Sequence, residues 1–371
     1  MTAVQDDMLI EIGIAVIKAL VVIQLVFGLA GILGWIERKG SALIQDRIGA
    51  NRASIFGFAG AGLINTMAAD PLKFITKEDI IPKGADRLLH WLAPCVNLFP
   101  AVVAFAVVPF GDVLYVGERA INLQVAPLDI GVLYILAIMS LGVYGVVLGG
   151  WASNNRYSLL GGIRGSAQMI SYELAMGLAL VAVVMTYGTL DLQEMARAQG
   201  EMLWGVVPAW GIFYQPLAFL ILLIAGIAES KRVPFDLPEG ESELVSGYFT
   251  EYSGVKYLMF FMSDFVEVGV VAALSTTFFF GGWQVPFLTS EGFAFGGTVV
   301  LALPNVVIVL LQLASFMLKV LFFCWLQILV RWSLPRYRYD QLMRFGWKTM
   351  LPVALANALI TAVVVLAFQE A

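Results

Sequence analysis

The sequence predicts an all-α polytopic membrane protein with about eight transmembrane helices and an N-terminus on the outside. Apolar residues make up 60% of the 371 residues and charged residues only 13%, with a mean hydropathy of +0.85. A soluble domain usually carries about 25% charged residues. The apolar residues are also gathered into long runs, and the basic residues are divided unequally between the connections. These three observations favour a single helical bundle in a bilayer.

The apolar runs supply the predicted helices. A helix needs about 20 apolar residues to cross a bilayer, and runs of this kind occupy 8–34, 91–111, 130–151, 167–187, 208–228, 257–282, 297–330 and 350–368. The run at 297–330 is longer than one straight span needs, so we expect it to tilt or to continue past the membrane. The acidic N-terminal stretch differs from a signal peptide, which begins with basic residues. The first run is therefore expected to be a retained span.

The basic residues set the predicted orientation. With the N-terminus outside, 18 of the 22 Lys and Arg residues fall in inside connections and 2 fall in outside connections. Inside connections are the ones enriched in Lys and Arg. We therefore predict one membrane domain, 1–371, whose functional face is formed by the inside connections 35–90, 152–166, 229–256 and 331–349. The net charge of −5 gives no basic surface for nucleic acid.

Metal chemistry is not predicted. The chain has one histidine, His90, and two cysteines, Cys95 and Cys324, all within or at the edges of apolar runs. A metal site needs a cluster of such ligands at suitable spacing. We expect His90 to be an interfacial or structural residue.

Among the ionisable residues within or at the ends of predicted spans, where charge is costly and by default indicates function, five are singled out. They are Glu173, Glu229, Asp264, Glu267 and Lys319. Loss of hydration favours the neutral form of a buried carboxyl group, which can then exchange a proton near neutral pH. Glu173 has no basic neighbour in sequence, so proton handling is predicted for it. For Lys319 the prediction is a structural pair with Asp264 or Glu267.

The connection ESKRVPFDLPEGESELVSGYFTEYSG, residues 229–254, carries six carboxylates and two basic residues. Its prolines break any long helix, and Glu239 and Glu243 would share a face if a helix restarts between them. Clustered acids have coupled protonation equilibria. A solvated acidic loop would explain the charge alone. The interleaved aromatic and aliphatic residues favour a loop that packs against the protein.

Asp70 and Pro71 follow the pattern of a helix N-cap with proline at the first helical position. Capping alone could therefore account for Asp70.

Long blocks of this sequence resemble the quinone-site membrane subunit of respiratory complex I, the H-type subunit of the bacterial enzyme, and its mitochondrial counterpart. The blocks are ERKGSALIQDRIG, AADPLKFITKEDIIP, GWASNNRYSLLGGIRGSAQMISYE, the connection at 229–254 and RYDQLMRFGWKTMLP. They occur in the family's order along nearly the whole chain.

The resemblance implies a subunit of a proton-pumping NADH:quinone oxidoreductase that is not catalytic alone. In this family the subunit lies where the peripheral arm docks on the membrane arm, forms the tunnel for the quinone tail, and begins a trail of carboxylates toward antiporter-like subunits. The implied partners are peripheral-arm quinone-site and iron–sulfur subunits, small membrane subunits and antiporter-like subunits. Iron–sulfur clusters and FMN would be on partners, with quinone as substrate and no cofactor on this chain. The implied location is the bacterial plasma membrane, with the mitochondrial inner membrane as the alternative.

The family's functional positions carry over to residues of this sequence. The resemblance implies quinone-tunnel roles for Glu37, Arg38, Arg47, Asp70, Glu78, Arg232 and Phe235, and proton-coupling roles for Glu173, Glu229, Glu239, Glu241, Glu243, Glu251 and Asp264. The chain departs from the family pattern at four positions. Ala50 stands where the family commonly has proline, and Pro71 where a small residue is common. Ser140 stands where some members have glutamate, and Asp264 where glutamate is common.

Three other functions would account for parts of this sequence. A homologous subunit of a related complex could receive electrons from hydrogen, ferredoxin or a deazaflavin, although the EGESELVSG block favours a quinone-linked member. A free-standing ion transporter would also carry intramembrane carboxylates, but the chain shows no inverted repeat of the kind transporters use. A purely structural anchor for a soluble arm would leave Glu173 unexplained.

Overall fold

The fold is a bundle of long helices, and the predicted fold class is confirmed. The computed structural model describes residues 2–54, 57, 60–117, 119–203, 207–295 and 298–369. Within these ranges, seven helical stretches are long and apolar enough to cross a membrane. They contain α1 (Thr2–Ile44), α3 (Arg87–Ala104), α4 (Gly131–Ala152), α5 (Arg156–Tyr187), α10 (Gly254–Phe279), α11 (Asn305–Ser333) and α13 (Leu351–Gln369). The predicted span at 208–228 is shorter, because α8 (Pro216–Glu229) is preceded by a separate turn, α7 (Gly211–Tyr214).

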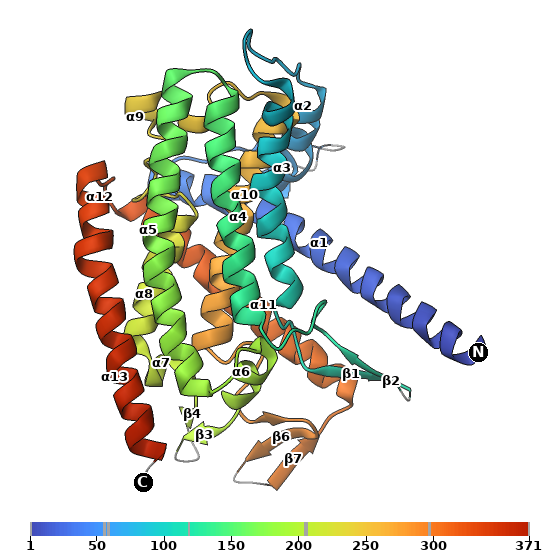
Figure 1. The fold of residues 1–371 in the computed structure, drawn as a ribbon. Coiled ribbons are helices and arrows are strands. Elements are labelled where there is room, and N and C mark those ends of the chain that lie inside the picture. Colours follow the sequence, from blue (N-terminus) through green and yellow to red (C-terminus); the bar gives the residue numbers. More distant parts are fainter. Residues whose placement is uncertain are drawn as a thin grey trace.

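The short elements lie at the two ends of the bundle. Figure 1 shows α2 (Asp70–Thr76) and α9 (Glu241–Leu244) at one end and the strands at the other. The strands within the described residues form three antiparallel sheets. They are β1 (Val113–Val116) with β2 (Arg119–Asn122), β3 (Met202–Leu203) with β4 (Val207–Pro208), and β5 (Leu288–Thr289) with β6 (Gly292–Phe295) and β7 (Thr298–Ala302). In the first, Val113 lies opposite Asn122. The remaining short helices are α6 (Leu192–Ala198), α12 (Tyr339–Phe345), η1 (Gly60–Gly62), η2 (Asn65–Ala69), η3 (Phe105–Val107), η4 (Gly247–Phe249) and η5 (Gly346–Met350).

Helix α1 is longer than one span requires. Its 43 residues extend about 65 Å, about twice the thickness of the hydrocarbon core. Its N-terminal part projects away from the other helices (Figure 1), whereas Val26, Leu29 and Leu33 in its second half are buried. The helix continues through Trp35 to Ile44, so the start of the predicted connection 35–90 is helical.

Helix α10 forms the centre of the bundle. Every position from Ser263 to Phe279 is buried, as expected for a helix that is apolar on all sides. It packs against α1, α3, α8 and α11. This central position takes Asp264 and Glu267, near its middle, out of contact with solvent.

Lys319 binds the turn that follows α10, and its predicted pairing with Asp264 or Glu267 is wrong. Its Nζ donates to the backbone carbonyls of Phe280, Gly282 and Gln284 at 2.9, 3.0 and 2.7 Å. These carbonyls lie after Phe279, the last residue of α10, and close to the negative end of the helix dipole. A lysine is well suited to that position.

Asp70 is not an N-cap, which corrects the expectation for this residue. The turn η2 runs directly into α2, so Asp70 is the first residue of α2 and its backbone is already helical. Its carboxylate instead forms an ion pair with Arg38 of α1. Pro71 lies in the first turn of α2, as its second residue and not as its first.

Candidate functional site

The connection after α8 is packed into the bundle. Phe235, Leu237, Leu244 and Tyr248 are all buried. The side chain of Gln168 on α5 holds this connection in place, because its Nε2 donates to the carbonyls of both Ala228 and Phe235 at 2.7 Å. The interpretation as a solvated loop is therefore wrong for this part of the chain. Tight packing brings the polar residues of the connection against α1, α10 and α11.

Glu37 joins three elements through two arginines. Its carboxylate lies 3.1 Å from Arg232 of the connection and 2.7 Å from Arg331 of α11. The guanidinium of Arg232 also lies over the ring of Phe265, with 4.1 Å between its carbon and the ring centroid. Both interactions suit arginine, which pairs with carboxylates and stacks on aromatic faces.

Lys231 lies beside this group and pairs with the two acids of α10. Its Nζ is 3.0 and 2.9 Å from the two carboxylate oxygens of Glu267 and 3.2 Å from Asp264 Oδ1. All three side chains are at most 5% exposed. The backbone of Lys231 has φ +55°, an uncommon left-handed conformation for a residue other than glycine. This turn aims the side chain at α10.

Glu229 and Glu173 are two further acids next to the ion pairs of Lys231. Glu229, the last residue of α8, is 3% exposed, and its Oε2 has no hydrogen-bond partner among the residues that the structure describes. Its charged neighbours include Glu173, Glu267 and Lys231. Glu173 is half-buried on α5. The carboxylates thus extend from α1 through α10 and α8 toward α5.

Asp236 and Glu239 form a second acidic group in the connection. Arg336 donates to Asp236 Oδ2 at 2.7 Å. Burial raises the pKa of Asp236 to about 6, although Arg336 and Arg331 oppose the rise. Burial also raises the pKa of Glu239 well above its ordinary value, and Asp236 and Asp264 add to the rise. Glu239 therefore holds its proton to a higher pH than an exposed glutamate does.

We expect Glu239→Gln to make the stability of the protein less dependent on pH. Because the folded pKa of Glu239 lies above its ordinary value, its contribution to stability is complete below that ordinary value and is lost as pH rises through the folded pKa. Between pH 5 and 9, the thermal unfolding midpoint of the wild type should therefore fall more steeply than that of the variant. Glu78→Gln, at an exposed acid, controls for loss of a negative charge. Parallel curves for wild type and Glu239→Gln would contradict the expectation.

The other acids of the connection are not part of one cluster. Glu243 is 54% exposed and accepts from Arg164 at 2.7 Å, and Glu251 accepts from Asn155 at 2.6 Å. The side chain of Glu241 lies outside the described residues. Helix α9 is only four residues long, so the expectation that Glu239 and Glu243 would share a helix face is wrong.

Of the predicted tunnel residues, Arg47 and Glu78 lie apart from the buried group. Arg47 is exposed and donates to Gln45 at 2.8 Å, while Glu78 is exposed and its carbonyl accepts from Ser253. Phe235 is buried between Tyr172 and Tyr337, with ring centroids 5.6 and 5.7 Å away. The structure therefore brings together Glu37, Arg232 and Asp264, with Phe235 in the same connection.

An apolar cavity of about 260 Å³ lies between α1 and α11. Its walls are mainly aliphatic and aromatic, and it is lined by Trp35, Ile36, Lys39, Gly40, Leu43, Ile44, Trp325, Ile328, Leu329 and Trp332. Glu37 and Arg331 lie within the same stretches of the two helices. Ile328 also lines a cavity of about 10 Å³ next to Glu37, Arg232 and Arg331, which has room for about one water molecule. The apolar cavity thus adjoins the charged group.

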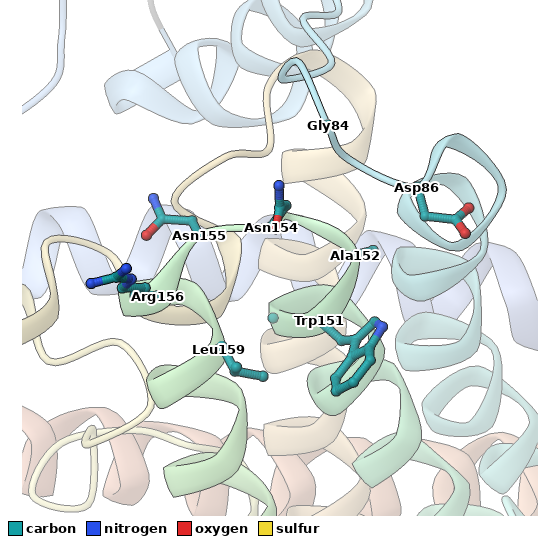
Figure 2. A pocket seen from close by; sticks show the side chains of 9 residues that line it. Gly84, Asp86, Trp151, Ala152, Asn154, Asn155, Arg156 and Leu159 are labelled. Atoms are coloured by element: carbon teal, nitrogen blue, oxygen red, sulfur yellow. The ribbon is translucent and has the colours of Figure 1, made fainter.

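A separate pocket of about 340 Å³ occurs where α4 turns into α5 (Figure 2). Two of its polar side chains are engaged in local structure. Asp86 accepts from the backbone of Leu88 and Leu89 at the start of α3, and Asn155 caps α5 while donating to Glu251. The polar side chains Asp86 and Asn155 of this pocket therefore serve as helix caps. His90 lies nearby on α3, buried and stacked on Tyr252 with 4.1 Å between ring centroids.

Sequence reasoning left five residues out of the predicted site. They are Lys231, Asp236, Glu267, Arg331 and Arg336, each in an ion pair with, or in the same buried group as, a predicted residue. A signal existed for Lys231, because two acids three apart on a buried helix need a nearby cation. No comparable signal identified Arg331 or Arg336, whose partners are about 100 or more residues distant in sequence.

The fold and the buried carboxylates define a multi-pass membrane protein with a line of ionisable groups. A sequence model described as NADH dehydrogenase matches residues 17–362, and the chain belongs to this family. It is 45% identical to an H-type subunit of NADH-quinone oxidoreductase from Cytophaga hutchinsonii over 90% of this chain and 91% of the relative. The corresponding protein from Geobacter metallireducens is also 45% identical (95% and 96% covered), and that of Bdellovibrio bacteriovorus is 41% identical (96% and 97%). The chain is thus similar to H-type subunits along nearly its whole length.

Proposed function

We propose that this chain is the membrane subunit of a proton-pumping NADH:quinone oxidoreductase that forms the quinone access tunnel and couples quinone reduction to proton translocation. The family and the names of its relatives support the enzyme class. The observation that carries the coupling role is a series of buried charged groups: Glu37 pairs with Arg232, Lys231 pairs with Asp264 and Glu267, Arg232 acts electrostatically on Asp264, and Glu267 acts electrostatically on Glu229. Ionisable groups at such depth mark proton or ion pathways.

The tunnel proposal is supported by the position of the apolar cavity. A quinone joins a polar headgroup to an apolar tail, so its path needs apolar walls that lead to polar groups. The cavity between α1 and α11 has apolar walls and adjoins Glu37 and Arg331. A change of charge at the quinone headgroup would act first on Glu37 and its partners Arg232 and Arg331. Arg232 would transmit it to Asp264, because it interacts electrostatically with both Glu37 and Asp264.

The proposal assigns the remaining roles to partners. The connections within 35–90, 152–166, 229–256 and 331–349 would form the docking face for the peripheral-arm quinone-site and iron–sulfur subunits. Small membrane subunits and antiporter-like subunits would bind the bundle and receive protons or their charge. FMN and iron–sulfur clusters would be held by partners, and the assembly would lie in the bacterial inner membrane. Purification of the tagged chain in mild detergent, with mass spectrometry of the bound proteins, identifies the electron-donor module.

Glu229→Gln tests the coupling role. The amide keeps the size of the side chain but cannot exchange a proton. If Glu229 carries protons, translocation should fall by about two orders of magnitude, while the assembled complex remains in the membrane. Proton uptake is measured with a pH-sensitive dye in inverted vesicles, together with NADH-driven quinone reduction.

Glu194→Gln serves as the control, because Glu194 is exposed on α6, away from the buried acids. Its translocation should match that of the wild type. If Glu229→Gln also pumped at the wild-type rate, the coupling role would have to be abandoned. Loss of both activities together with loss of the complex from the membrane would indicate a structural role instead.

A further inference from the structure

We propose that Lys231 divides the buried acids into two groups: it holds Asp264 and Glu267 as ionised carboxylates and leaves Glu229 as the protonated one. This inference rests on the proposed function, because it assigns the proton-carrying state to particular residues of the carboxylate series. Lys231 would be a positioning residue, which acts through the acids that it binds.

The geometry around the ammonium group carries the first part. Nζ lies within 3.0 Å of both oxygens of Glu267 and 3.2 Å from Asp264 Oδ1. Two of the three ammonium donors bond Glu267, and Asp264 Oδ1 lies at ion-pair distance without a hydrogen bond among the described residues. Burial alone would lower the pKa of Lys231, but Glu267 and Asp264 outweigh burial and raise it. The lysine is therefore a fixed positive charge.

The three arginines of the neighbouring charged groups form their ion pairs with other acids, although Arg232 also acts electrostatically on Asp264. Arg232 and Arg331 pair with Glu37, and Arg336 pairs with Asp236. Within the part of the chain that the structure describes, Lys231 is the one cation at ion-pair distance from Asp264 or Glu267. Removal of its charge would leave two buried carboxylates three residues apart. At least one of them would then take up a proton, because a buried unpaired charge is strongly unfavourable.

Glu229 differs from these two acids although it lies close to them in space. It has no ion pair within the described residues, and its Oε2 is buried without a hydrogen bond. Its nearest charges include two further carboxylates, Glu173 and Glu267. The ionisable groups around the whole arrangement are Glu173, Arg232, Asp236, Glu239 and Tyr248. A neutral Glu229 is thus the favourable state.

Carbodiimide labelling of the purified resting complex tests this division. Carbodiimides react with protonated carboxyl groups in apolar surroundings, and peptide mass spectrometry identifies the labelled residue. In the wild type, we expect no label on Asp264 or Glu267, with Glu229 as the labelled acid of the three. In Lys231→Gln, label should appear on Glu267 or Asp264. Lys231→Arg keeps the positive charge and should show the wild-type pattern.

Two outcomes would overturn the inference: label on Glu267 or Asp264 of the wild type, or no new label in Lys231→Gln. Labelling of the wild type shows whether Glu267 and Asp264 are protonated even if the Lys231→Gln complex fails to assemble. The labelling is done without NADH, so it does not depend on turnover. Failure here together with loss of pumping in Glu229→Gln would overturn the role of Lys231 and leave the proposed function intact.

Discussion

Glu37→Ala is expected to destabilise the protein by about 2–4 kcal/mol. Removal of one partner from a buried ion pair costs about 3–5 kcal/mol because the remaining charge is left uncompensated, and here the change removes the partner of both Arg232 and Arg331. The side chains of Glu37, Arg232 and Arg331 are 14%, 11% and 24% exposed, so solvent screening reduces the expected value. Quinone reduction should fall as well, since the residue joins the apolar cavity to the buried acids.

The thermal unfolding midpoint of the purified complex and its amount on native gels measure the effect. Asp340→Ala is the matched control, because Asp340 also pairs with an arginine, Arg338, but both side chains are more than half exposed. Exposed pairs contribute about 0–1 kcal/mol. A Glu37→Ala protein as stable as Asp340→Ala would show that the pairing of Glu37 is energetically unimportant.

Much of the fold could be predicted because a bilayer restricts the possibilities. Backbone groups must be hydrogen-bonded within the segment in lipid, so each long apolar run predicts a helix, and all seven long spans lie at predicted runs. The irregular start of the run at 208–228 could not be predicted from hydropathy alone. Gln215 separates α7 from α8 and is held by Thr186 and Thr361. Such long-range contacts leave no local pattern in the sequence.

The sequence was sufficient to identify unusual ionisable residues of the site. It was not sufficient to identify which of them form ion pairs with one another. The cost of burying charge singled out Asp264 and Glu229 correctly as unusual. The same reasoning assigned Lys319 to the wrong partner, because sequence does not show that the turn after α10 presents carbonyls to it. The closeness of the acids at 239–251 in sequence also suggested one cluster, which the structure does not contain. Short helical turns direct Glu243 toward Arg164 and Glu251 toward Asn155.

Gly161→Ala is expected to destabilise the protein by about 3 kcal/mol, at the upper end of overpacking effects. A Cβ at this position of α5 would lie 2.8 Å from the carbonyl oxygen of Pro238, 2.7 Å from the nitrogen of Tyr248 and 2.8 Å from Cα of Gly247. These are backbone atoms, which cannot rotate away as a side chain can. The connection would have to move away from α5, and Glu239, which follows Pro238, would move with it.

Gly177→Ala provides the control in the same helix, because nothing lies within 4 Å of a Cβ there. That change should be neutral or stabilise the helix by about 0.5–1 kcal/mol, since glycine is unfavourable in helix interiors. The thermal unfolding midpoints of the two variants separate the effect of steric contact at Gly161 from the effect of replacing glycine by alanine in a helix. Proteolysis within 238–249 should accelerate in Gly161→Ala alone, because displacement exposes this segment. Equal protease resistance in both variants would mean that the bundle absorbs the extra methyl group without releasing the connection that carries Glu239.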